Sequence, residues 1–159
     1  MARNLFSLRT PLDLLRKLER ESDRLRDAVR PTDQSDHFYN FCVSASAMKN
    51  YVFAALEVPP NDPNRRTWIR RWHSKCPRLT YCEHIATAPA NDGDRAIPTG
   101  IGLRSIRIET APTNVVAMRR PRNDLHPASN DDAIVKAPDL TREVTDFWRT
   151  ELARLNLLR

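Results

Sequence analysis

Four side chains that could bind a metal ion lie within twelve residues of one another. They are His73, Cys76, Cys82 and His84, spaced H-x2-C-x5-C-x-H. Zinc accepts imidazole and thiolate ligands, but this spacing is not that of the usual zinc knuckles, and residues two apart on a helix point to different sides. Buried thiols are also common in proteins without metal. We therefore expect no cofactor, and zinc is the alternative that these residues leave open.

The same part of the chain holds a concentration of positive charge. From Asn64 to Cys82, here called the basic segment, there are six basic residues and no acidic one, whereas the other 140 residues hold 20 of each kind. The formal net charge of +6 therefore lies in this segment. A localised basic patch beside tryptophans indicates an anionic partner, with nucleic acid the first candidate. The candidate binding residues are Arg65, Arg66, Arg70, Arg71 and Lys75.

The basic segment also has an interpretation without a ligand. On a helix, Trp68, Ile69 and Trp72 share one side and the arginines occupy the other. An amphipathic helix that buries its tryptophans and leaves its arginines in water would have this pattern. The lack of compensating acidic residues is what favours a binding role.

Hydrophobic spacing predicts two long helices in the first third of the chain. The first begins with Thr10 as its cap, Pro11 at its first position and Asp13 three residues after the cap, and Pro31 ends it. Apolar residues recur in it at helical spacing, with dense charge between them: Leu14, Leu15, Leu18, Leu25 and Val29. The second helix follows start signals at residues 33–36 and is apolar on nearly all sides, which is typical of the central helix of a bundle.

The rest of the chain predicts two more bundle helices, a small sheet and a closing helix. The basic segment forms a short third helix, and a fourth runs from Pro77 to about Ala88, so that the bundle covers residues 10–88. Three strand-like segments predict a small antiparallel sheet over residues 101–137. Leucine and aromatic spacing predicts a helix over residues 139–157. We expect a single domain of residues 1–159, mainly α with a small β part (α+β).

Two stretches of the predicted bundle resemble a known family. The segment SDHFYNFCVSASAMKNYVF and the later CPRLTYCEHIA are similar to a group of small prokaryotic helical proteins, which in turn resemble the HEPN superfamily of nucleotide-binding domains. The resemblance covers roughly residues 35–91. It implies a helical bundle that forms a homodimer, with arginine and histidine side chains of both subunits at a shared cleft. It also implies a metal-independent endoribonuclease in a toxin–antitoxin or antiphage setting.

Active members of that superfamily carry an arginine and a histidine separated by four to six residues, and Arg78 and His84 match this motif with five. A histidine can exchange the proton of a ribose 2′-hydroxyl while a guanidinium holds the phosphate. The resemblance therefore implies that Arg78 and His84 are catalytic. Other pairs, such as Arg66 and His73, share this spacing, and the Asn-Gly-Ser-Lys-His of the relatives is replaced here by the residues from Thr87 on. A degenerate, non-catalytic cleft is thus the alternative.

Composition narrows the class of protein. An apolar content of 40% and a charged content of 29% fit a soluble globular protein, and the least polar stretch, Phe38 to Leu56, contains Lys49 and is a poor membrane span. The first residues lack the apolar run of a signal peptide, and three cysteines, an odd number, indicate reduced thiols. We expect a cytoplasmic protein that engages RNA or another nucleic acid, as a homodimer or with a partner protein. The alternative is a non-catalytic binding module or an assembly subunit.

Overall fold

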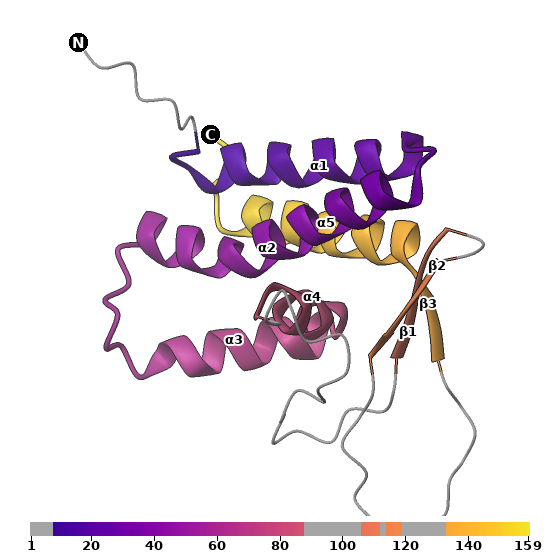
Figure 1. Ribbon diagram of the computed structural model, residues 1–159. Coiled ribbons are helices and arrows are strands. Elements are labelled where there is room, and N and C mark those ends of the chain that lie inside the picture. The colour runs from indigo at the N-terminus through magenta and orange to yellow at the C-terminus, as the bar shows by residue number, and fades with distance from the viewer. Residues whose placement is uncertain (1–7, 88–105, 112–113, 119–132) are drawn as a thin grey trace, which may run out of the picture.

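Five helices and a three-stranded sheet make up the described part of the chain, which comprises residues 8–87, 106–111, 114–118 and 133–159 of the computed structural model in Figure 1. The helices are α1 (Pro11–Asp27), α2 (Pro31–Ala55), α3 (Asn64–Lys75), α4 (Arg78–Thr87) and α5 (Ala137–Arg154). The strands are β1 (Ile106–Ala111), β2 (Asn114–Met118) and β3 (Ala133–Lys136). The mainly helical fold that the sequence predicts is confirmed.

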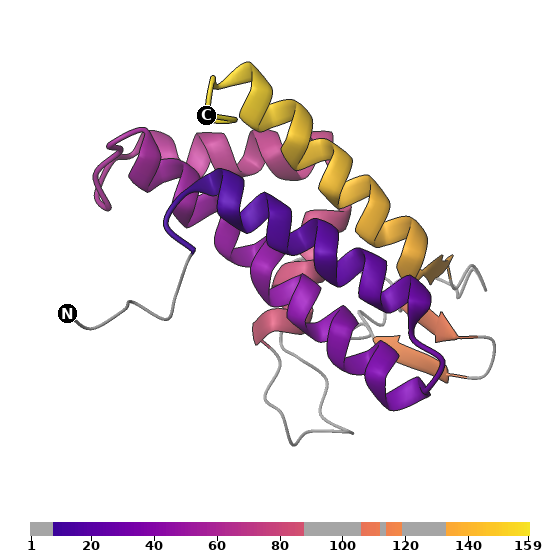
Figure 2. The same cartoon turned by 90° about the horizontal axis from the view of Figure 1, so that it is seen from above.

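The helices form a bundle around α2. Helix α2 contacts α1 on one side and α4 on the other, and it also contacts α5 and β1. The two views in Figures 1 and 2 place α1 and α5 side by side, with α3 and α4 across α2 from α1 and the sheet at one end of the bundle. The predicted central place of this helix is confirmed. It is not buried on all sides, however, because Tyr39 and Val43 are 45% and 38% exposed.

Helix α1 begins as the sequence predicts but ends earlier. The Thr10 hydroxyl accepts a hydrogen bond from the Asp13 amide at 3.1 Å, and the Asp13 carboxylate accepts one from the Thr10 amide at 3.0 Å, which completes a capping box. Because α1 ends at Asp27, Val29 lies beyond it and is 91% exposed, so the prediction that Val29 continues the helical pattern is wrong. Pro31 starts α2 rather than ending α1, since proline suits the first turn of a helix.

The end of α2 sets the path toward α3. Glu57 adopts a left-handed backbone with φ of 53°, and the amide of Val58 donates to the carbonyl of Phe53 at 2.8 Å. This is a Schellman ending, which closes the last turn of a helix and redirects the chain. Helix α5 ends in the same way, with Asn156 at φ of 57° and Leu157 bonded to Leu152 at 2.9 Å. At this turn the Val58 carbonyl accepts a hydrogen bond from the side chain of Arg65 on α3.

The sheet is mixed, so the prediction of an antiparallel sheet is wrong. Its strand order is β2-β1-β3, with β1 antiparallel to β2 but parallel to β3. Residues 119–132 separate β2 from β3 in the sequence, and β3 pairs with the edge of β1 opposite to β2. The predicted strand residues 101–105 and 119–120 lie outside the described residues.

Helix α5 follows β3 directly and carries one of the main faces of the core. Its residues Leu140, Val144, Trp148 and Leu152 are all at most 1% exposed, as their helical spacing predicts. The helix occupies residues 137–154 rather than 139–157. In the part of the chain that the structure describes, none of the helices combines the length and the apolar character that crossing a membrane requires.

Candidate nucleic-acid interface

Helix α3 is held in the bundle by Trp72. This side chain is 1% exposed, and its ring centroid lies 5.3 Å from that of Phe53, 5.7 Å from that of Trp68 and 5.3 Å from that of Trp148. Its indole nitrogen donates a hydrogen bond of 2.9 Å to Glu151 on α5. The tryptophans of the basic segment thus face inward, as predicted, and the inner side of α3 is fixed by aromatic packing and one buried hydrogen bond.

The carboxylate of Glu151 also binds Arg154 and lies near Lys75. The Arg154 guanidinium donates to Glu151 at 2.6 and 3.0 Å, and the Lys75 ammonium lies 3.8 Å from it. The hydrogen bond from Arg154 lowers the pKa of Glu151 and that from Trp72 lowers it further, against the opposing effect of burial. Arg154 therefore neutralises this carboxylate, and Lys75, whose side chain is 44% exposed, stays accessible to a ligand beside it.

Arg65 also serves the fold. Its guanidinium donates to the Val58 carbonyl at 2.9 Å and lies 4.5 Å from the centroid of the Phe53 ring. The first contact ties α3 to the turn after α2, and the second is a cation–π interaction. Arg65 therefore anchors the beginning of α3 and does not project toward a partner.

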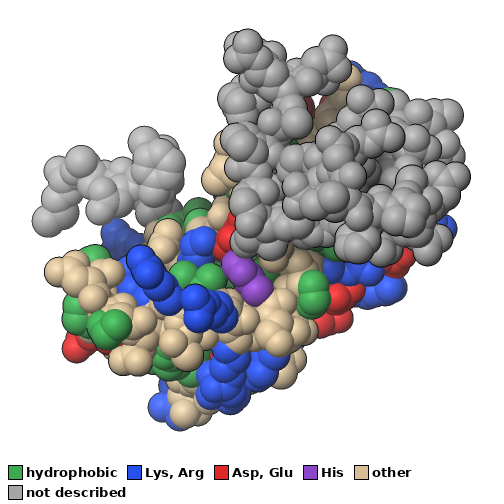
Figure 3. Space-filling view, turned by 90° about the horizontal axis from the view of Figure 1, so that it is seen from below, with side chains coloured by type: hydrophobic (Ala, Val, Ile, Leu, Met, Phe, Trp, Pro, Cys, Tyr) green, Lys and Arg blue, Asp and Glu red, His purple; other side chains and the backbone are tan. Residues whose placement is uncertain are grey.

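Three predicted binding residues remain on the outer side of α3. Arg66, Arg70 and Arg71 are exposed, and none of them makes an ion pair or a side-chain hydrogen bond within the described residues. Arg66 and Arg70 are one helical turn apart and so share a face. Figure 3 views the molecule from the side on which α3 lies and shows lysine and arginine side chains gathered there around a histidine. We call these three residues the α3 arginine face.

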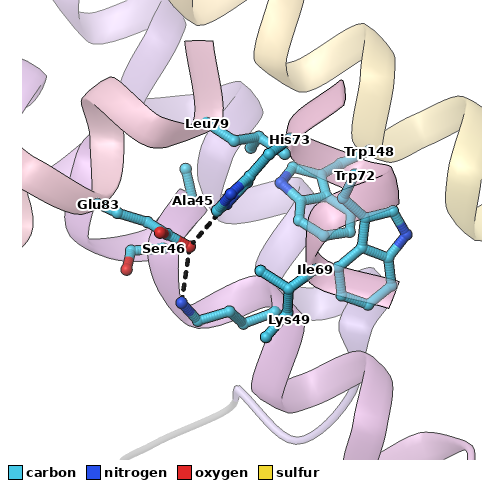
Figure 4. A pocket seen from close by; sticks show the side chains of 9 residues that line it. All are labelled: Ala45, Ser46, Lys49, Ile69, Trp72, His73, Leu79, Glu83 and Trp148. Atoms are coloured by element: carbon cyan, nitrogen blue, oxygen red, sulfur yellow. Dashed lines mark hydrogen bonds and ion pairs between the residues drawn. The ribbon is translucent and has the colours of Figure 1, made fainter. Parts of the chain in front are cut away.

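A polar cluster borders this face. The Glu83 carboxylate on α4 lies 3.2 Å from His73 Nε2 on α3 and 2.6 Å from Lys49 Nζ on α2 (Figure 4). Burial raises the pKa of Glu83, but the hydrogen bonds from His73 and Lys49 outweigh burial and leave that pKa below its ordinary value. His73 is three residues after Arg70, so the cluster continues the outer side of α3 toward α4.

Sequence reasoning named His73 as a zinc ligand and as one of several histidines spaced like the Arg78–His84 motif, and it did not find Lys49 or Glu83 as parts of a site. The available signal was Lys49 itself, the only charged residue between His37 and Glu57. A lone charge on an otherwise apolar helix requires a partner, but the sequence does not show which carboxylate supplies it.

The hollow between these residues is too small for a substrate. It has a volume of about 10 Å³ and is bordered by Trp72, Trp148 and the polar cluster, which is the space that one water molecule needs. A ligand of the α3 arginine face would therefore lie on the surface, in contact with charge, and not with a base inside a pocket.

The predicted catalytic residues Arg78 and His84 are not brought together within one copy of the chain. Arg78 Nε donates to the carboxylate of Glu143 on α5. His84 follows six residues later on the same helix, which places the two side chains about 120° apart around its axis. Nε2 of His84 is buried and has no hydrogen-bond partner among the described residues.

The cysteines lie in the core as free thiols. Burial and the nearby Glu143 carboxylate raise the pKa of Cys76 to about 11, and a hydrogen bond with Cys42 together with burial raises the pKa of Cys82 well above its ordinary value. In the described ranges, no three His, Cys, Asp or Glu side chains converge in a way that could hold a metal ion.

Of the seven predicted site residues, three have no ion pair or side-chain hydrogen bond among the described residues, namely Arg66, Arg70 and Arg71. Arg65 and Arg78 are held by contacts within the fold. Lys75 is exposed near Glu151, and His84 has a buried Nε2 without a partner among the described residues. No family model, curated protein or solved structure matches this chain. Its function is therefore inferred from its own residues.

Proposed function

We propose that this chain binds RNA or another nucleic acid through the α3 arginine face. The observation that carries the proposal is the contrast between the two sides of α3. Three exposed arginines without a carboxylate partner in the described residues lie on the outer side, and Trp72 fixes the inner side. Guanidinium groups bind phosphate oxygens in a bidentate manner, and here they project from an anchored helix.

The mode of binding follows from the lack of a pocket beside the arginines. The adjoining hollow has room for about one water molecule, so no base can be enclosed there. Contacts would go to the phosphate backbone, which supports binding without sequence readout. Neutralising three phosphates of a single strand gives an affinity that falls with salt with a logarithmic slope of about −2.

A matched pair of double variants tests this proposal. Arg66→Glu/Arg70→Glu on α3 and Arg16→Glu/Arg20→Glu on α1 make the same change in net charge, and each pair consists of exposed residues four apart on one helix. In filter binding of single-stranded RNA at ~50 mM salt, the α3 variant should lose more than about 100-fold in affinity and the α1 variant less than about 5-fold.

Two outcomes would contradict the proposal. Equal losses in the two variants would show that only net charge matters. If the unaltered protein retained neither RNA nor DNA at low salt, the face would have no nucleic-acid role, and an acidic protein partner would be the remaining alternative.

Metal-independent cleavage of RNA by a HEPN-like homodimer is the second candidate. The observation behind it is Nε2 of His84, which is buried and has no hydrogen-bond partner among the described residues; the imidazole would have to become accessible before it could exchange a proton with a 2′-hydroxyl. The ion pair between Arg78 and Glu143 argues against cleavage, because a second subunit would have to release the guanidinium from Glu143 before it could hold a phosphate. Incubation with mixed RNA in EDTA, beside Arg78→Ala and His84→Ala, separates the candidates. Intact RNA with the unaltered protein, or cleavage that both variants retain, removes these residues from any reaction.

A further inference from the structure

The hollow beside the polar cluster has about the size that a single water molecule needs. It lies between α2, α3, α4 and α5, and its volume is about 10 Å³. Polar side chains border it, among them Ser46, His73 and Glu83. Apolar side chains supply most of its lining, and a hollow of this size holds a water molecule only where polar groups in its wall offer two to four hydrogen bonds.

One wall of the hollow contains a buried hydrogen-bond donor without a partner. Trp148 is 1% exposed and borders the hollow, and its Nε1 has no hydrogen-bond partner among the described residues. The neighbouring indole of Trp72 differs, because its nitrogen donates to Glu151. Figure 4 shows the two indole nitrogens turned to opposite sides. Buried N–H groups in folded proteins almost always bond to protein or to ordered water.

Acceptors are available on the other walls. Oε1 of Glu83 receives both Lys49 and His73, while its Oε2 makes no hydrogen bond within the described part of the chain. Ser46 also borders the hollow, and its hydroxyl makes no hydrogen bond among the described residues. A molecule in the hollow could accept from the indole and donate to one or two of these oxygens, which gives it the two to four partners that a buried water requires.

We infer that a single ordered water molecule occupies this hollow and joins the indole N–H of Trp148 to the polar cluster of Lys49, His73 and Glu83. The water links α5 to α4 and to the end of α3, and so holds the histidine beside the α3 arginine face. The inference does not depend on nucleic-acid binding, because it rests on the hollow and on the donor in its wall.

Nuclear magnetic resonance of ¹⁵N-labelled protein tests the inference. The three tryptophans give three indole signals, and Trp148→Phe assigns the one that matters by removing it. We expect a cross-peak between water and the indole proton of Trp148, with the sign of a long-lived bound water. The indole proton of Trp72 serves as the control and should show none, because it is bonded to Glu151. A Trp148 indole proton without a water cross-peak would overturn the inference.

A second experiment uses a variant whose larger side chain fills the hollow. Ala45 lines it and is 2% exposed, so Ala45→Val should displace the water and abolish the Trp148 cross-peak while the other two indole signals persist. A crystal structure of the unaltered protein decides the matter independently of this variant. Density about 3 Å from Trp148 Nε1 supports the inference, whereas an empty hollow, or an anomalous peak there after a bromide soak, contradicts it.

Discussion

Helix α3 and the first half of helix α4 lie in the basic segment, yet their arginines have different environments. Arg66 and Arg70 of α3 face solvent, whereas Arg78 of α4 faces Glu143 of α5. Helix α4 contacts α2, α3 and α5, and α5 brings a carboxylate to it. Helix α3 packs through the Trp72 side and leaves its outer side open. In this chain, the place of a helix in the bundle, and not its charge, decides which arginines are available to a partner.

The largest effect is expected from removing the anchor of α3. Trp72→Ala deletes the contacts with Phe53, Trp68 and Trp148 and leaves the Glu151 carboxylate without its indole donor. The free energy of unfolding should fall by about 3–5 kcal/mol, measured by urea denaturation followed by circular dichroism. Trp68→Ala, at a half-buried position of the same helix, should cost less than half as much. Equal costs would mean that Trp72 is not the anchor.

A smaller, opposed pair of effects tests the contrast between the two helices directly. Arg78→Ala breaks a partly exposed ion pair and should lower the free energy of unfolding by up to about 1 kcal/mol, without changing the affinity for RNA. Arg70→Ala should leave stability within about 0.5 kcal/mol and reduce the salt slope of RNA binding by about 0.7. If Arg78→Ala weakened binding and Arg70→Ala did not, the roles of the two helices would be reversed.

The smallest effect concerns the two carboxylates that hold α3. The pKa values of Glu83 and Glu151 are lowered from 4.5, so below that pH the unfolded chain binds more protons than the folded one. Their contribution to stability is complete above about pH 4.5 and is lost as the pH falls through the lowered values. The melting temperature should therefore vary little with these groups from pH 7 to 5 and decrease below pH 4.5.

Glutamine variants assign this acid sensitivity. Glu83→Gln and Glu151→Gln should each make the melting temperature less dependent on pH below 4.5. Glu57→Gln, at an exposed position with no ion pair among the described residues, is the control and should retain the full dependence. An unchanged acid profile in both cluster variants would show that other carboxylates dominate.

Local features of the fold were predictable where one short segment determines them. The capping box at Thr10 and the inward side of α3 follow from residues three or four positions apart, and their spacing is visible in the sequence. The start of α2 was placed too late because Pro31 can either end a helix or begin one. The choice depends on the turn before it, where Val29 projects into solvent.

Features that depend on distant residues were not predictable. Nothing near Arg78 in the sequence indicates that Glu143, 65 residues later, pairs with it, and the Glu83 cluster joins residues of three helices. The direction of β3 likewise depends on how the chain returns to β1. Charge and spacing thus identify candidates for a site, and only packing shows which of them the fold has already used.

The aromatic cluster under α3 has an optical consequence. All three tryptophans of the chain belong to it, because Trp68 and Trp148 both pack on Trp72. Intrinsic fluorescence therefore reports one place in the molecule, the contact of α3 with α5. Undocking of α3 would shift the emission to longer wavelength even while the other helices stayed folded. The tryptophans of the chain thus serve as an intrinsic fluorescent probe of the packing of α3, the helix that carries the arginine face.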